Sequence, residues 1–113
     1  MNPANPIDLA VFEELCDTAG ADFVAELVGT FLEEAPLLLS ELREARAAGA
    51  SPRFQRAAHS LKSNAQTFGG SELGGLAREL ELGGLDSASD ERLQALDAAW
   101  QRTAATLKEL QHG

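Results

Sequence analysis

His59 is the residue of this chain best suited to chemistry, because an imidazole changes charge near neutral pH and its neutral form has a lone pair. It lies in a segment whose apolar residues recur with helical spacing. With about 100° between successive residues, His59 falls about 140° from Phe54, on the other side of the helix. We therefore expect His59 to face water. The expected buried face consists of Phe54, Ala57, Ala58, Leu61, Ala65 and Phe68.

The charges around His59 differ from those of the whole chain. The chain has 18 Asp and Glu residues and a formal net charge of −9, yet the segment 45–71 contains no acid. This pattern favours a local anion site, with a phosphoryl group as the natural ligand, over an ordinary surface histidine. The cations of the segment are Arg46, Arg53, Arg56 and Lys62.

Four side chains are expected beside His59 on the outer face of its helix, because they lie one or two turns away. Lys62 would stabilise the charge of a phosphoryl group on His59. Ser63 would leave room for a docking protein. The expected partner-binding residues are Arg56, Ser63 and Gln66.

The residues around His59 form a recognisable motif. Residues 58–62 read A-H-S-L-K and residues 68–70 read F-G-G, with small residues between them. This pattern resembles the signature of the histidine-containing phosphotransfer (HPt) domain family, roughly A-H-x-L-K-G-S-S-x-x-[hydrophobic]-G-[A/G], although residues 63–65 read S-N-A in place of G-S-S. Residues 30–36, T-F-L-E-E-A-P, resemble the long helix that precedes the phosphorylated helix in that family.

The resemblance implies a phosphoryl carrier of a two-component phosphorelay. His59 would accept the phosphoryl group from an aspartate of a response-regulator receiver domain and pass it to another receiver. A hybrid sensor kinase would be a further partner. The chain would hold no cofactor of its own, since Mg²⁺ would be bound by the receiver. We expect a carrier and not an enzyme, because no nucleotide-binding motif or kinase core is evident.

Other functions fit the residues less well. A hydrolase needs an orienting acid and a nucleophile beside its histidine, and the segment 45–71 has no acid. Metal or haem binding would rest on His59 and His112 alone. The phosphoacceptor domain of a chemotaxis-type kinase shares the fold, but a kinase core is missing. A helical protein-interaction module without phosphotransfer is the main alternative, against which the intact His59 and Lys62 argue.

Length and composition predict one all-α domain. The 113 residues are rich in Ala and Leu and include one Trp and no Tyr. The net charge of −9 disfavours nucleic acid and anionic membranes as partners, so we expect protein partners. We also expect the protein to be a monomer. The single cysteine, Cys16, excludes an internal disulfide. No signal peptide or membrane span is evident, and we expect a cytoplasmic protein.

The caps and apolar stripes predict an antiparallel four-helix bundle with a short extra N-terminal helix. All of residues 1–113 would belong to this domain, with residues 1–6 frayed. Short connections make successive helices antiparallel. The expected bundle helices span 22–48, 51–68, 71–83 and 89–111, and the extra helix spans 8–19 with Leu9, Phe12, Leu15 and Cys16 as its apolar stripe.

Helix ends and interruptions give sharper expectations. Pro36 removes one helical hydrogen bond and predicts a kink, with two separate helices as the alternative. Gly74 and Gly75 would either weaken their helix or let two backbones approach closely. The residues placed to cap helices are Asp8, Ser51, Ser71 and Ser89.

Overall fold

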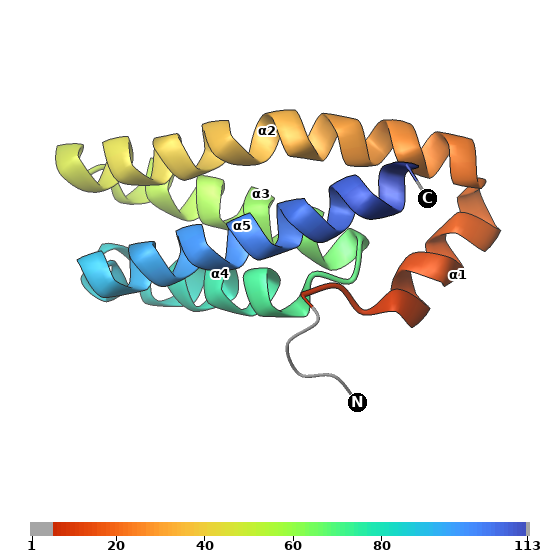
Figure 1. Cartoon of the computed structure of the whole chain (residues 1–113). Coiled ribbons are helices and arrows are strands. Elements are labelled where there is room, and N and C mark those ends of the chain that lie inside the picture. Colours follow the sequence, from red (N-terminus) through yellow and green to blue (C-terminus); the bar gives the residue numbers. More distant parts are fainter. Residues whose placement is uncertain (1–5, 113) are drawn as a thin grey trace.

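The computed structural model describes residues 6–112, which form five α-helices and contain no strand. Helices α2 to α5 lie alongside one another in alternating directions, and α1 covers one end of this bundle (Figure 1). The predicted all-α bundle is confirmed, and each helix agrees with its predicted bounds to within one residue. Residues 1–5 of the expected frayed segment lie outside the described residues. The helices are α1 (Leu9–Ala19), α2 (Ala21–Ala48), α3 (Ser51–Thr67), α4 (Ser71–Gly83) and α5 (Asp90–His112), with a short 3-10 helix, η1 (Gly84–Ser87), before α5.

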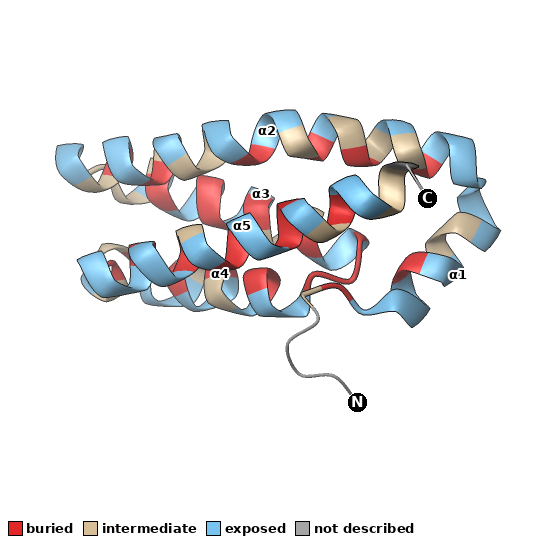
Figure 2. Cartoon of the chain, in the orientation of Figure 1, coloured by how far each residue is buried: buried red, intermediate tan, exposed pale blue. Residues whose placement is uncertain are grey.

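The core lies between the facing sides of α2, α3, α4 and α5, where Figure 2 shows the buried residues. Phe31 of α2 stacks on Phe68 at a centroid distance of 5.4 Å and meets Trp100 of α5 edge-on at 5.2 Å. Such aromatic pairs stabilise a core by about 1 kcal/mol beyond their burial. All six residues of the predicted buried face of α3 are buried, namely Phe54, Ala57, Ala58, Leu61, Ala65 and Phe68.

Helix α2 continues through Pro36, so the alternative of two separate helices is wrong (Figure 1). Pro36 is exposed, while Ala35 and Leu42 on either side of it are fully buried. The apolar stripe therefore keeps its phase across the proline. As a result, α2 offers one continuous face to α3 and α5.

Two of the four predicted helix caps are confirmed. The Asp8 carboxylate accepts hydrogen bonds from the backbone N–H groups of Ala10 and Val11, at 3.0 and 3.4 Å. The Ser89 hydroxyl accepts one from the N–H of Arg92 at 3.1 Å. Both satisfy donors that the first turn of a helix leaves unpaired.

The other two predicted caps, Ser51 and Ser71, are wrong, because both serines already lie inside their helices. Ala50 donates its N–H to the carbonyl of Ala45 and closes α2, and its own carbonyl accepts from Phe54 and opens α3. The cap position of α3 is therefore occupied by Ala50, and Ser51 is the first residue of the helix. In the same way, Gly70 occupies the cap position of α4 and Ser71 follows it inside the helix.

Helix α1 is fastened to the turn that follows α3. The N–H of Asp8 donates to the carbonyl of Gly69 at 2.8 Å, and Ile7 is buried beside it. Gly69 has a φ of +82°, and a Cβ there would lie 2.8 Å from the carbonyl oxygen of Asp8, so only glycine fits. Phe12 is buried as predicted, whereas Leu9 is 43% exposed, because α1 covers only the end of the bundle.

Helices α3 and α4 form a closely packed antiparallel pair. A Cβ on Gly74 would lie 3.2 Å from Cγ of Gln66 and 3.7 Å from the carbonyl oxygen of Lys62. The predicted close approach is thus confirmed for Gly74. Gly75 faces open space and does not contribute to it. This packing brings the outer edge of α4 within reach of the functional side chains of α3.

Candidate functional site

His59 lies in the middle of α3, and its side chain is 58% exposed. The residue before it, Ala58, is fully buried against the core. A helix packed in this way holds the imidazole on a rigid support while leaving it open to water. The prediction that His59 faces solvent is confirmed.

A carboxylate from α4 lies against His59. Oε2 of Glu81 is 2.7 Å from Nδ1 of His59, and Oε1 of Glu81 is 2.8 Å from Nζ of Lys62. The expectation that no acid lies near His59 is therefore wrong. That expectation rested on the segment 45–71 alone, whereas Glu81 comes from the neighbouring helix α4.

The contact fixes the chemistry of the two imidazole nitrogens. The hydrogen bond from Lys62 is the main cause that lowers the pKa of Glu81; partial burial raises it, and the hydrogen bond with His59 lowers it further. Glu81 is thus ionised at neutral pH and can only accept hydrogen bonds, so Nδ1 of His59 carries the hydrogen. In the neutral ring, the lone pair is then on Nε2. Within residues 6–112, the imidazole of His59 has no other hydrogen-bond partner.

The basic residues of the segment 45–71 are mostly neutralised by acids from other parts of the chain. Arg56 is exposed and has no ion pair within the described residues. The predicted concentration of free positive charge is therefore wrong for three of the four cations. The three ion pairs are Arg46–Asp90 at 2.6 Å, Arg53–Glu41 at 2.8 Å and Lys62–Glu81 at 2.8 Å.

The other predicted site residues divide into two groups around His59. Arg56 lies with His59 and Glu81 in the wall of a hollow of about 530 Å³, which also includes Pro52, Gln55 and Ser60. Ser63 and Gln66 are exposed further along α3 and do not line this hollow.

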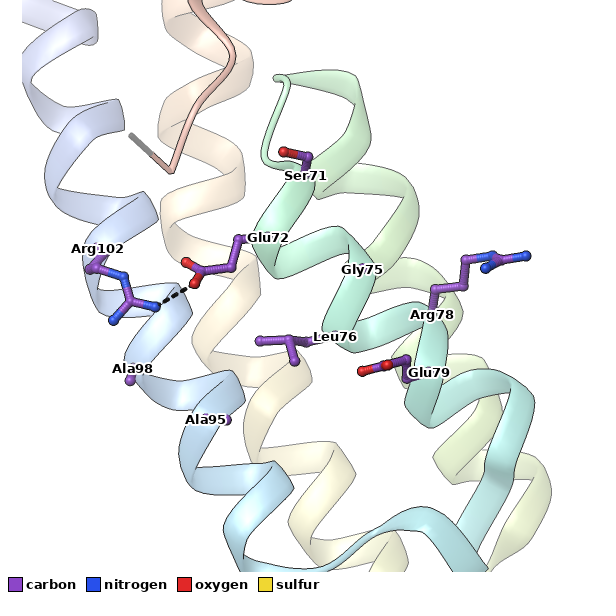
Figure 3. Close-up of a pocket in the computed structure, with 9 residues that line it drawn as sticks. All are labelled: Ser71, Glu72, Gly75, Leu76, Arg78, Glu79, Ala95, Ala98 and Arg102. Atoms are coloured by element: carbon purple, nitrogen blue, oxygen red, sulfur yellow. Dashed lines mark hydrogen bonds and ion pairs between the residues drawn. The ribbon is translucent and has the colours of Figure 1, made fainter. Parts of the chain in front are cut away.

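A second hollow, of about 760 Å³, lies between α4 and α5 and shares no residue with the first (Figure 3). Glu72 of α4 and Arg102 of α5 point toward each other there and form an ion pair at 2.8 Å. Its walls contain neither histidine nor cysteine. We therefore locate the candidate site at His59.

Three further observations concern metal ions, membranes and hydrolase chemistry. No group of three or more His, Cys, Asp or Glu residues in the described part of the chain could hold a metal ion. None of the helices described in residues 6–112 has the length and apolar character needed to cross a membrane. No hydroxyl or thiol of the described residues is hydrogen-bonded to His59, as a hydrolase of the serine or cysteine type would require.

Glu81 could have been found from the sequence by the geometry of the α3–α4 pair. In an antiparallel helix pair, residues equally distant from the turn lie opposite each other. His59 and Glu81 are each 11 residues from Gly70. Glu81 also follows Leu80, the last buried residue of the α4 stripe, and so lies at the edge of the buried face.

The fold and the site together define a helical bundle that displays one histidine, held by a carboxylate, on an exposed helix face. The family model of the Hpt domain matches residues 26–112, most of the chain, and the protein belongs to the Hpt domain family. Hpt domains are phosphocarrier modules that bear the phosphoryl group on a histidine in phosphorelays. Neither the comparison with curated proteins nor that with solved structures finds a match.

Proposed function

We propose that this protein carries a phosphoryl group on His59, accepting it from the aspartate of one receiver domain and passing it to another. The observation that carries the proposal is the 2.7 Å contact between Glu81 and Nδ1 of His59. It leaves the lone pair on Nε2, which a nucleophile on an exposed helix face requires. Membership of the Hpt domain family supports the same role.

The proposed transfer needs no general base on this chain, because no proton has to leave the imidazole. The lone pair of Nε2 attacks the phosphorus of an aspartyl phosphate in the receiver. The N–P bond forms as the P–O bond to the aspartate breaks, and the aspartate leaves as a carboxylate. The proton on Nδ1 stays in place, so the phosphorylated ring is positively charged beside Glu81. Transfer to the next receiver reverses these bond changes.

We propose that Lys62 stabilises the phosphoryl charge through Glu81. The carboxylate alone would repel an incoming phosphoryl group. The Lys62 ammonium, 2.8 Å from Glu81, offsets this charge. Catalytic assistance beyond that would come from the receiver, whose Mg²⁺ would neutralise phosphoryl oxygens. We propose no cofactor on this chain.

The proposed docking surface consists of Arg56, Ser63 and Gln66, on either side of His59 along α3. All three are exposed. Exchange between two receivers needs rapid release, so we expect micromolar or weaker binding through a contact below about 1,200 Å². Receivers, including one attached to a hybrid sensor kinase, are our proposed partners, with the protein acting as a monomer in the cytoplasm.

Incubation with phosphorylated receivers from the same organism tests the proposal. Label from at least one receiver should appear on His59 within seconds to minutes, in an acid-labile form, and should return to a receiver when Mg²⁺ is present. His59→Ala is the control. If no receiver transfers label, while another protein binds the same face stably and binds His59→Ala equally well, the protein is an interaction module without phosphotransfer.

A further inference from the structure

The ammonium group of Lys62 already has a partner. Its Nζ lies 2.8 Å from Oε1 of Glu81, and the Lys62 side chain is only 20% exposed. Lys62 would have to share its charge between this carboxylate and a phosphoryl group on His59, using the N–H donors that Glu81 leaves free. The closer Lys62 came to the phosphoryl group, the less of its charge would offset Glu81.

Arg56, by contrast, has no acid bound to its guanidinium group within the described residues. It is exposed, lies one turn before His59, and forms no ion pair within residues 6–112. The acid whose charge it influences, Glu41, is already bound by Arg53 through two hydrogen bonds of 2.8 and 2.9 Å. A guanidinium group can bind two phosphoryl oxygens at once, which an ammonium group does less well.

The direction in which the side chains of α3 point also favours Arg56. Side chains on an α-helix lean toward its N-terminus, so the His59 ring lies over the turn that contains Gln55 and Arg56. The hollow of about 530 Å³ beside His59 includes both of these residues and does not include Lys62. The imidazole itself lines this hollow, so we expect a phosphoryl group on Nε2 to lie within reach of Arg56.

We propose that Arg56, rather than Lys62, binds the phosphoryl group of phosphorylated His59, inside the hollow that these residues share with Gln55 and Ser60. This inference rests on the proposed function, because it concerns the same histidine after transfer. It assigns separate tasks to the two cations: Lys62 balances Glu81, and Arg56 holds the phosphoryl oxygens.

The experiment uses phosphoprotein made with phosphoramidate, a small phosphoryl donor, so that no receiver groups are present. Nitrogen-15 NMR should show that phosphorylation shifts the Arg56 Nε–H signal and protects it from exchange, while the Lys62 ammonium signal stays in place. Phosphorus-31 NMR over a pH series gives the apparent pKa of the phosphohistidine. Arg56→Gln should raise this value by about half a unit or more, because a nearby cation favours the deprotonated form.

Lys108→Gln is the matched control. Lys108 is exposed on α5 and has no ion pair within residues 6–112, so the substitution removes the same unit of charge away from α3. Its phosphohistidine should titrate like the wild type. An Arg56 signal that does not move, or a Lys62 signal that moves instead, would overturn the inference while leaving the carrier role intact. Failure of both phosphoramidate and receivers to phosphorylate His59 would overturn the carrier role and the inference together.

Discussion

Oε2 of Glu81 lies 2.7 Å from Nδ1 of His59, although 22 residues separate them in the sequence. The two side chains come from different helices, so the orientation of the imidazole depends on how α3 packs against α4. Gly74 permits that packing, since a Cβ there would lie 3.2 Å from Gln66. A substitution that separates the two helices would therefore disturb the histidine without touching it.

Glu81→Gln should slow phosphoryl transfer to His59 by about tenfold, because the hydrogen bond that Nδ1–H donates loses its charged acceptor. The amide keeps the size of the carboxylate and can still accept the Nδ1 hydrogen. Glu81→Ala removes both the charge and the acceptor and should be slower still. Rapid-quench measurement of transfer from a phosphorylated receiver gives the rates. Equal rates for wild type and both variants would contradict a positioning role for Glu81.

His59→Gln should abolish acid-labile labelling and leave the fold intact. The side chain is 58% exposed, and most substitutions at such positions change stability little. The melting temperature, followed by circular dichroism, should change by no more than a few degrees. Residual label in the variant, or its unfolding, would show that the phosphoacceptor has been wrongly assigned.

Ser63→Trp should prevent receivers from docking, because the indole would project from the outer face of α3 beside His59. Lys62→Ala should instead slow transfer while changing receiver affinity little. Gln101→Trp, on the exposed side of α5, is the control for added bulk. Titration calorimetry with one receiver measures the affinity of all three variants. Unchanged affinity of Ser63→Trp would remove Ser63 from the interface.

Acid should destabilise the protein partly through Glu41. The hydrogen bonds from Arg53 are the main cause that holds the pKa of Glu41 below its ordinary value of 4.5. A carboxyl group with a lowered pKa in the folded state adds stability above its unfolded pKa, and this contribution is lost as the pH falls through the folded value. The melting temperature should therefore fall from about pH 5 downward.

Glu41→Gln isolates this contribution. The variant should melt lower than the wild type at pH 7, and the difference between the two should shrink as the pH falls below about 4. Glu109→Gln, which alters an exposed acid without an ion pair in residues 6–112, should follow the wild-type curve. A constant difference between Glu41→Gln and wild type across this range would argue against the Arg53 pair as the cause.

Gly69→Ala should destabilise the protein by about 1–3 kcal/mol, because the left-handed backbone at φ +82° disfavours a side chain and the new Cβ would meet the carbonyl of Asp8. Gly75→Ala is the matched control, since it lies in α4 with open space around it. It should be neutral or stabilise by up to about 1 kcal/mol. Urea unfolding measures both. Equal stability of the two variants would show that the contact with Asp8 adapts without strain.

The exposed position of His59 was predictable because it follows from one helix alone. Periodicity within the segment around Phe54 fixes both the buried face and the face that the imidazole occupies. The helix bounds were predictable for a similar reason, since Gly20, Gly49 and the residues after them mark local changes of backbone direction.

The charge environment was not predictable in the same way, because it depends on residues from different helices. Absence of acids from the segment 45–71 indicated an exposed cationic surface, yet Glu41, Glu81 and Asp90 reach that segment from α2, α4 and α5. A local count of charges cannot show which acids tertiary packing will bring near. The register of an antiparallel helix pair can, as the equal spacing of His59 and Glu81 from Gly70 illustrates.

The attachment of α1 has a practical consequence for protein engineering. The family match begins at residue 26, inside α2, and leaves out all of α1. A fragment cut at that boundary would lose the first turn of α2, the buried side chains of Ile7 and Phe12, and the hydrogen bond from Asp8 to Gly69. The end of the core beside Phe68 would then lie open to water. Fusions and truncations that are meant to keep the carrier folded should therefore retain the chain from Ile7 onward.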